Sequence, residues 1–267
     1  MAKLVMAVGV PHGPMIPWQI ANEPGKHAAE GLMKDVREQL EAAEPDVIIE
    51  TTSDHFNNFS FQHLSQFCLG IVDQAEGPVE TYCPMPPQVM KGHPEMGKAL
   101  LTYGLRSGFD LGVAQELRLD HSVLVPLHVL TPNMEIPVVP LYTNGLVPPL
   151  PQTRRCFNLG RMIRRFVEDW DRDLRVAVVA SGVFSLEIGG PKFGTVDEEW
   201  TSAVRSMLEG GKHESLIRRA TEPRMLAAGN VSGELLNWVT MAGTVGEIKP
   251  KFLETERGRG YAVWKLD

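Results

Sequence analysis

Short apolar runs alternate with amphipathic segments along most of this chain, and that alternation limits the folds open to it. Residues 4–10 form an apolar run that ends at Pro11, which is typical of a buried strand. Apolar side chains then recur at helical spacing over 28–40, and β-branched residues follow over 46–52. A strand, a helix and a second strand in this order form the unit from which parallel sheets are built.

The same alternation continues towards the C-terminus, where we expect helices over 94–105 and 154–170 and strands over 136–142 and 174–180. Thr195 and Glu198 have the spacing of a capping box, which predicts the start of a further helix. Only 57–94, rich in Phe, Gln, Pro and Gly, breaks the pattern, and we expect an irregular insertion there that forms a binding loop or partner surface. We therefore expect one α/β domain over 1–267, with a largely parallel central sheet flanked by helices.

Charge and cysteine content narrow the class of protein. The formal net charge of −7 argues against binding to nucleic acid or to an anionic membrane surface. The three cysteines show no CxxC pairing, which favours a reducing compartment: Cys68, Cys83 and Cys156. The N-terminal apolar run is too short for a signal peptide, and no run approaches the ~18 apolar residues of a membrane helix. We expect a cytoplasmic protein.

Two histidines follow the first two expected strands. His12 comes after the first strand and His55 after the second. Because the carboxyl ends of parallel strands lie on the same side of a sheet, the two imidazoles can meet. A carboxylate would complete a 2-His-1-carboxylate face, and Glu234, in the apolar stretch SGELLNW at 232–238, is the candidate. Taken singly, each histidine also fits an ordinary loop or core residue, and Glu234 fits a charge at a helix N-terminus.

Four stretches carry a resemblance to a known family: Asp-His at 54–55, LDHSVLVPL at 119–127, RRCFNLG at 154–160 and ELLNW at 234–238. In these stretches the chain resembles the class III extradiol ring-cleavage dioxygenases, the family of the protocatechuate 4,5-dioxygenase beta subunit. The resemblance extends from the first strand to about Gly246 and implies the α/β fold of that subunit.

The resemblance also implies a chemistry. It assigns Fe(II) to His12, His55 and Glu234, and the opening of a catechol-, protocatechuate- or gallate-like diol by O2. It places His121 beside substrate and oxygen without binding metal, although His121 also fits a plain N-terminal helix residue after an Asp120 cap. Asp54 would orient His55 or a loop amide. An oligomer is implied, either a homodimer or a complex with a small alpha subunit.

One position departs from the family. Members usually read Ser-Gly-Gly-hydrophobic-Ser-His where this chain has SGVFSL at 181–186, so the histidine that handles protons is replaced by Leu186. Three explanations are open. Glu187 or His121 supplies the proton path, the substrate makes a separate base unnecessary, or the chain has lost turnover. In the first two cases we expect Asp54, Ser185 and Leu186 to line the substrate pocket.

Other activities remain as alternatives. The ring could be an aminophenol or a hydroxypyridine type, or the chain could be a non-catalytic subunit of such an enzyme. A divalent-metal hydrolase on the same scaffold would use metal-bound hydroxide instead of oxygen. The basic residues nearest these stretches, available to meet a substrate carboxylate, are Arg154, Arg155 and Lys192.

Overall fold

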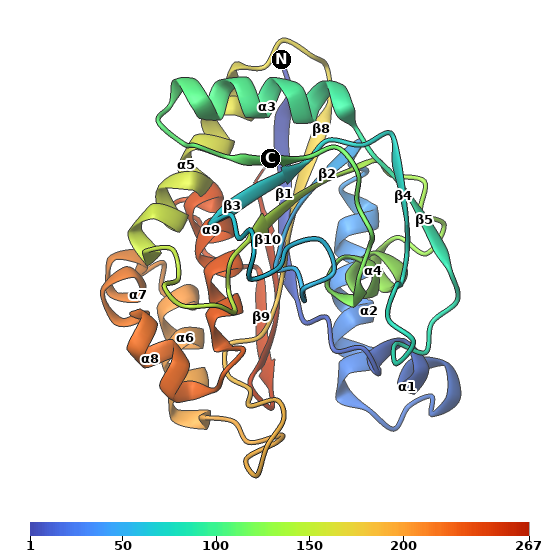
Figure 1. Cartoon of the computed structure of the whole chain (residues 1–267), viewed down its shortest axis with the longest axis vertical. Helices are drawn as coiled ribbons and strands as arrows, with labels where there is room; N and C mark the ends of the chain where they lie inside the picture. The colour runs from blue at the N-terminus through green and yellow to red at the C-terminus, as the bar shows by residue number, and fades with distance from the viewer. Residues whose placement is uncertain (267) are drawn as a thin grey trace.

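The centre of the molecule is a twisted sheet in the order β6-β3-β7-β2-β8-β1-β10-β9, seen in a computed structural model that describes residues 1–266 (Figure 1). The strands of this sheet are β1 (Lys3–Val10), β2 (Val47–Thr52), β3 (Phe67–Gly70), β6 (Gly112–Ala114), β7 (Val138–Thr143), β8 (Arg175–Ser181), β9 (Phe252–Glu256) and β10 (Arg259–Lys265). The helices are α1 (Ile16–Asn22), α2 (Ala28–Ala42), α3 (Pro94–Arg106), α4 (His121–Leu130), α5 (Thr153–Asp169), α6 (Glu198–Glu209), α7 (His213–Arg219), α8 (Glu222–Ala228), the 3-10 turn η1 (Ser232–Glu234) and α9 (Leu235–Val245).

The predicted strands form the parallel middle of this sheet. β7, β2, β8 and β1 run parallel, whereas β3 pairs with β7, and β10 with both β1 and β9, in the antiparallel sense. The register pairs Val10 with Ser181 and Thr51 with Ala180. The carboxyl ends of β1, β8 and β2 therefore lie level with one another, and the loops that follow them start side by side.

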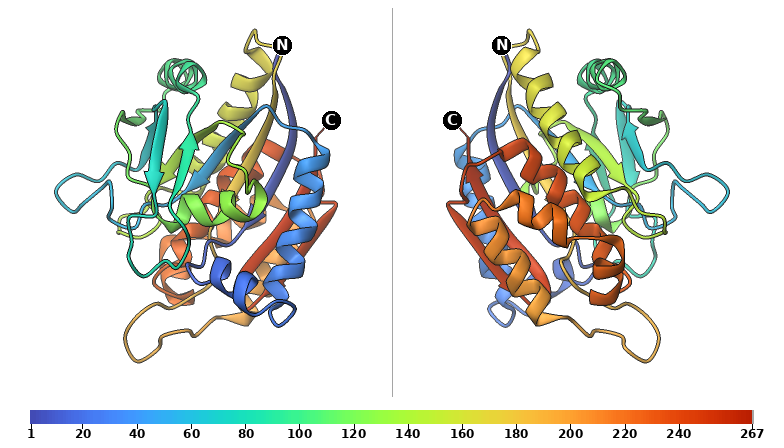
Figure 2. Two further views of the ribbon diagram at one scale, coloured as in Figure 1. Left: turned by 90° about the vertical axis from the view of Figure 1, so that its right-hand side faces the viewer. Right: turned by 90° about the vertical axis from the view of Figure 1, so that its left-hand side faces the viewer.

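Helices cover both faces of the sheet, so its strands are buried on both sides (Figures 1 and 2). α2 and α4 pack on one face, where Val8 and Ile48 belong to the core. α5 and α9 pack on the other, where Ala7 and Ile49 belong to a second core. Burial on both faces explains why these strands read as nearly continuous apolar runs. The expectation of an α/β fold with a largely parallel central sheet is confirmed. No helix of the described residues is long and apolar enough to cross a membrane.

Two local expectations were wrong. The segment 57–94 is not wholly irregular, because it contributes β3 to the main sheet and a separate hairpin of β4 (Gln74–Gly77) and β5 (Gln88–Lys91). Thr195 does not cap α6. The cap is Asp197, whose Oδ1 accepts a hydrogen bond from the Trp200 amide at 2.8 Å. Asp197 lies directly before the first helical residue, where a side-chain oxygen can reach the free amides of the first turn.

Two glycines let α5 and α9 cross at close range. A Cβ on Gly160 would overlap the carbonyl oxygen of Thr240, and a Cβ on Gly243 would overlap that of Phe157. Since α9 begins directly after Glu234, this crossing fixes the helix next to one of the candidate metal ligands. The two glycines thus contribute to the position of the site as well as to packing.

We predict that Gly160→Ala lowers the free energy of unfolding by about 1–3 kcal/mol, because an added methyl group has no space between the two helices. The measurement is urea unfolding followed by circular dichroism. Gly31→Ala is the control, since Gly31 lies exposed on α2 with nothing within 4 Å of an added Cβ. It should stabilise by up to ~1 kcal/mol, as alanine favours the helix. Equal effects of the two substitutions would contradict this account of the crossing.

Candidate metal centre

The loops after β1 and β2 bring two histidines together at one edge of the sheet. His12 follows β1 by two residues and His55 follows β2 by three. Their ring centroids lie 5.3 Å apart, and their planes are nearly perpendicular. Both side chains are largely buried, at 5% and 15% exposure. The level carboxyl ends of the parallel strands account for this meeting of residues 43 positions apart.

Glu234 completes the group from the opposite side. It is the last residue of η1, and its side chain is 2% exposed. Its Oε1 lies 3.2 Å from His12 Nε2 and 3.3 Å from His55 Nε2. Its Oε2 accepts a hydrogen bond from the Val183 amide at 3.1 Å. One carboxylate oxygen therefore faces both imidazoles, while the backbone holds the other.

The outer nitrogen of each imidazole is held by the protein. Ser181 Oγ donates to the Ser122 carbonyl at 2.8 Å, so it accepts from His12 Nδ1 at 2.6 Å. Asp120 Oδ2 accepts from His55 Nδ1 at 3.0 Å. Both rings thus carry their hydrogen on Nδ1 and turn Nε2 inwards, which is the arrangement typical of metal-binding histidines.

Opposite charges compensate one another in this buried group. Burial alone lowers the pKa of His55, but hydrogen bonds to Asp120 and Glu234 raise the pKa of its ring to about 10. Burial raises the pKa of the Glu234 carboxyl, but the charges and hydrogen bonds of His12 and His55 hold this pKa well below its usual range. The carboxylates therefore demand positive charge between them, which protons or a divalent cation can supply.

The donor set fits a divalent transition metal. Two imidazole nitrogens and one carboxylate oxygen on one side of a site form the face found in non-heme Fe(II) oxygenases. Ligand atoms of His12, His55 and His121 lie within 4.8 Å of one another, as do those of Glu80, Asp120 and His121. In the second group the carboxylates already accept hydrogen bonds from His55 and His121. The face formed by His12, His55 and the Glu234 oxygen is therefore the better metal site, and His121 lies beside it.

The start of α9 ties the site to the strand ends. Asn237 Nδ2 donates to Ser53 Oγ at 3.1 Å and to the Ser181 carbonyl at 2.9 Å. Trp238 Nε1 donates to the Gly182 carbonyl at 3.1 Å. The asparagine and tryptophan of the ELLNW stretch therefore hold the segments after β2 and β8 in place around the glutamate.

Gly182 leaves the space that the glutamate occupies. Its φ of 149° is a conformation that side-chain-bearing residues rarely adopt, and a Cβ there would lie 2.8 Å from Glu234 Cβ. The chain thus needs glycine between β8 and Val183 for the carboxylate to approach the two histidines.

His121 lies against the two imidazoles at the N-terminus of α4. Its ring centroid is 4.2 Å from that of His55 and 5.4 Å from that of His12. Asp120 caps the helix as expected, with Oδ1 accepting from the Ser122 amide at 3.1 Å. Asp120 therefore serves both the helix and His55, a second role that its position in the sequence does not reveal.

Two partners of these histidines were not foreseen from the sequence. Glu80 Oε1 accepts from His121 Nδ1 at 2.6 Å, and Ser181 holds His12 as described above. Ser181 directly follows the predicted strand 174–180 and could have been considered on that ground. Glu80 lies in the loop between β4 and β5, where neither periodicity nor a motif marks it.

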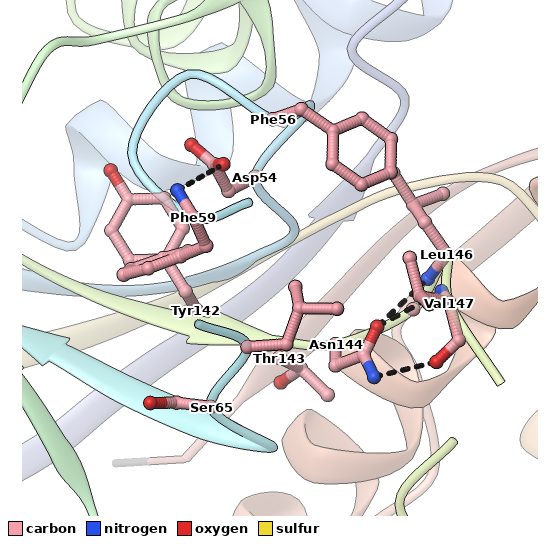
Figure 3. Close-up of a pocket in the computed structure, with 11 residues that line it drawn as sticks. Asp54, Phe56, Phe59, Ser65, Tyr142, Thr143, Asn144, Leu146 and Val147 are labelled. Atoms are coloured by element: carbon pink, nitrogen blue, oxygen red, sulfur yellow. Dashed lines mark hydrogen bonds between the residues drawn. The ribbon is translucent and has the colours of Figure 1, made fainter. Parts of the chain in front are cut away.

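Asp54, which was expected to line the substrate pocket, binds backbone amides of the loop after His55. The Asp54 carboxylate accepts from the amides of Asn57, Asn58 and Phe59 at 3.0–3.1 Å, so it shapes the loop after His55. Figure 3 shows this residue at one side of a small pocket that also has Phe56, Phe59, Tyr142 and Val147 in its lining. The pocket begins at the residues on either side of His55 in the chain.

The residues after β8 are held mainly by backbone contacts. Ser185 is fully buried, and its hydroxyl donates to the Ala228 carbonyl at 2.6 Å and accepts from the Asp197 amide at 2.7 Å. Leu186 is partly buried, and its amide donates a hydrogen bond to Ser232 Oγ at 3.2 Å. The Glu187 carboxylate accepts from the Asn230 amide at 2.9 Å. The polar groups of Ser185 and Glu187 are thus already engaged with the backbone.

Two of the three basic residues named from the sequence have partners other than a substrate, and the third is exposed. Arg154 forms a two-pronged ion pair with Glu214, at 2.6 and 2.7 Å. Arg155 lies over the rings of Phe67 and Phe109. Lys192 is exposed in the loop after β8. A guanidinium nearer the site is that of Arg259, whose Nη2 is 3.7 Å from the position of a Cβ on Gly13, next to His12.

Comparison with known proteins places this geometry in a family. Residues 6–259 match the family model described as the catalytic LigB subunit of aromatic ring-opening dioxygenase. A 2,3-dihydroxyphenylpropionate/2,3-dihydroxicinnamic acid 1,2-dioxygenase of Paraburkholderia phymatum is 31% identical over 202 residues, 74% of this chain and 60% of the relative. A gallate dioxygenase of Pseudomonas putida is 29% identical over 158 residues, 58% of this chain and 46% of the relative. The chain thus spans about three fifths or less of the length of these relatives.

The fold has a counterpart among solved structures. The crystal structure of an uncharacterized protein from Escherichia coli K12 matches with a TM-score of 0.62 and 15% sequence identity, over 98% of this chain and 100% of that one. This likeness concerns the fold alone. The family match covers nearly the whole chain, and it includes every residue of the metal centre described above. The chain therefore belongs to the LigB family of aromatic ring-opening dioxygenases.

Proposed function

We propose that this protein is a non-heme Fe(II)-dependent dioxygenase that opens the ring of a small aromatic diol with O2. The observation that carries the proposal is the buried Glu234 oxygen facing the Nε2 atoms of both His12 and His55. Iron bound by this face supplies open positions at which a diol and oxygen meet. The similarity to a 2,3-dihydroxyphenylpropionate dioxygenase and to a gallate dioxygenase supports an aromatic diol.

Among the candidate proton carriers, the geometry favours His121 over Glu187. His121 Nδ1 donates to Glu80, so Nε2 is the ring nitrogen that this contact leaves available. Its ring contacts that of His55, so Nε2 is free to exchange a proton with a substrate at the metal face. The Glu187 carboxylate holds the Asn230 amide instead.

The proposal predicts iron-dependent oxygen uptake that matches the amount of ring-opened product, and it predicts loss of iron when a ligand is removed. His12→Ala, His55→Ala and Glu234→Ala each leave too few donors to hold a labile Fe(II). Anaerobic metal analysis and an oxygen electrode, with charged and uncharged catechols, gallates and aminophenols, make the measurement. His27→Ala is the control, since His27 pairs with Glu23 away from the site. Full iron in all three variants would refute the site, and zinc-dependent turnover without oxygen would favour a hydrolase.

A second prediction concerns His121→Phe, which keeps a ring at the N-terminus of α4 but removes both nitrogens. We expect the variant to bind iron as the wild type does and to turn over about 10²–10⁴-fold more slowly, the range for loss of an acid/base group. The rate is measured at saturating substrate with iron content determined on the same sample. An unchanged rate would remove His121 from the chemistry.

A third prediction concerns Leu186, where the family usually has histidine. If the site works around an apolar side chain, Leu186→His buries an imidazole without a prepared partner, which costs about 1–3 kcal/mol. The backbone of Leu186 is fixed by Ser232 and Val231, so the change is confined to the side chain. We expect the variant to be slower than the wild type on every diol of the panel. Ring opening that appears only in the variant would instead identify the wild type as a non-catalytic subunit.

A further inference from the structure

Glu80 contacts His121 at two points. Its Oε1 accepts from His121 Nδ1 at 2.6 Å, and its Oε2 accepts from the His121 amide at 3.0 Å. Both oxygens of one carboxylate therefore bind one residue, the side chain through one oxygen and the backbone through the other. These two contacts fix the plane of the His121 ring and also place its hydrogen on Nδ1, because Nδ1 must carry the hydrogen to donate.

Burying the Glu80 carboxylate costs free energy unless hydrogen bonds or a positive charge compensate it. Glu80 is 9% exposed and is buried near a further carboxylate, that of Asp120, in a chain with a net charge of −7. Asn57 Nδ2 and Tyr82 Oη also donate to its Oε1, but only at 3.4 and 3.3 Å. The two shortest contacts of the Glu80 carboxylate are both to His121, so His121 is the residue that this carboxylate binds most strongly.

The loop that carries Glu80 does not depend on its carboxylate. The Val79 amide donates to the Leu119 carbonyl at 3.0 Å, and the Leu119 amide to the Glu76 carbonyl at 3.0 Å. The β4–β5 hairpin below is paired through its own backbone. The segment is therefore anchored by main-chain hydrogen bonds, and a change of the Glu80 side chain can be made without unfolding it.

We propose that Glu80 is a positioning residue that holds His121 in the tautomer with hydrogen on Nδ1 and presents Nε2 to the metal face. The consequence for catalysis rests on the proposed function, whereas the positioning itself does not. Glu80 would thus give His121 a fixed orientation beside the metal face. The device resembles the carboxylates that orient catalytic and metal-binding imidazoles elsewhere, but here it acts on a histidine that is not a ligand.

Glu80→Gln tests this proposal with little change in shape. Glutamine replaces one of the two accepting oxygens by an NH2 group, which donates, so it cannot accept at both positions where the His121 ring and the His121 amide donate. Nitrogen NMR of ¹⁵N-histidine-labelled protein, loaded with diamagnetic zinc, reports the His121 tautomer. We expect hydrogen on Nδ1 alone in the wild type and a mixture of tautomers in Glu80→Gln. Glu76→Gln, an exposed carboxylate of the same hairpin, is the control and should match the wild type. An unchanged tautomer in Glu80→Gln overturns the proposal, whether or not the enzyme opens rings.

Kinetics supply the second readout. Glu80→Gln should lower kcat about 10–100-fold, the range for loss of a group that orients a functional histidine, with iron content unchanged. In a His121→Phe background the same substitution should have no further effect on kcat, because the positioning acts through His121. A further loss of the same size in that background would assign Glu80 a role independent of His121 and contradict the proposal. Absence of ring opening in the wild type would count against the proposed function, and the tautomer would still decide the role of Glu80.

Discussion

The organisation of this molecule depends on one buried carboxylate oxygen that faces two imidazoles. Glu234 Oε1 lies 3.2 and 3.3 Å from the Nε2 atoms of His12 and His55, and almost no solvent reaches it. A carboxylate in such a place is unfavourable unless positive charge lies beside it. Three features bring these charges together: the level ends of the parallel strands, the glycine at position 182, and the crossing of α5 with α9.

The groups around this centre are arranged as three imidazoles, each with one oriented outer nitrogen. Ser181, Asp120 and Glu80 hold the Nδ1 atoms of His12, His55 and His121 in turn. These contacts at Nδ1 fix the direction of the inner Nε2 atom of each ring. Rings held in this way need less reorganisation during a reaction than flexible side chains would need. In our proposal this preorganisation includes His121, the candidate proton carrier.

The sequence predicted the parts of the molecule that follow from local pattern and topology. β-branched apolar runs identified the parallel strands, and the rule that parallel strands end at one edge brought His12 and His55 into one group. The pairing of Asp120 with His55 and of Glu80 with His121 joins residues 65 and 41 positions apart, so no local pattern could reveal it. β3, β6, β9 and β10 were not predicted: the first three are short and lack a long apolar run, and β10 lies beyond the alternation of strands and helices that identified the others. The capping-box spacing pointed to Thr195, but this spacing does not reveal which oxygen lies closest to the free amides, and that oxygen belongs to Asp197.

The position of a bound iron tests the central claim most directly. Crystals of the protein loaded anaerobically with Fe(II) would locate the metal by anomalous scattering at the iron edge. We predict a single peak bonded to His12 Nε2, His55 Nε2 and Glu234 Oε1, with His121 beside it but not coordinated. A peak among Glu80, Asp120 and His121, the other group of donors close enough to share an ion, would contradict the account, as would no peak at either place.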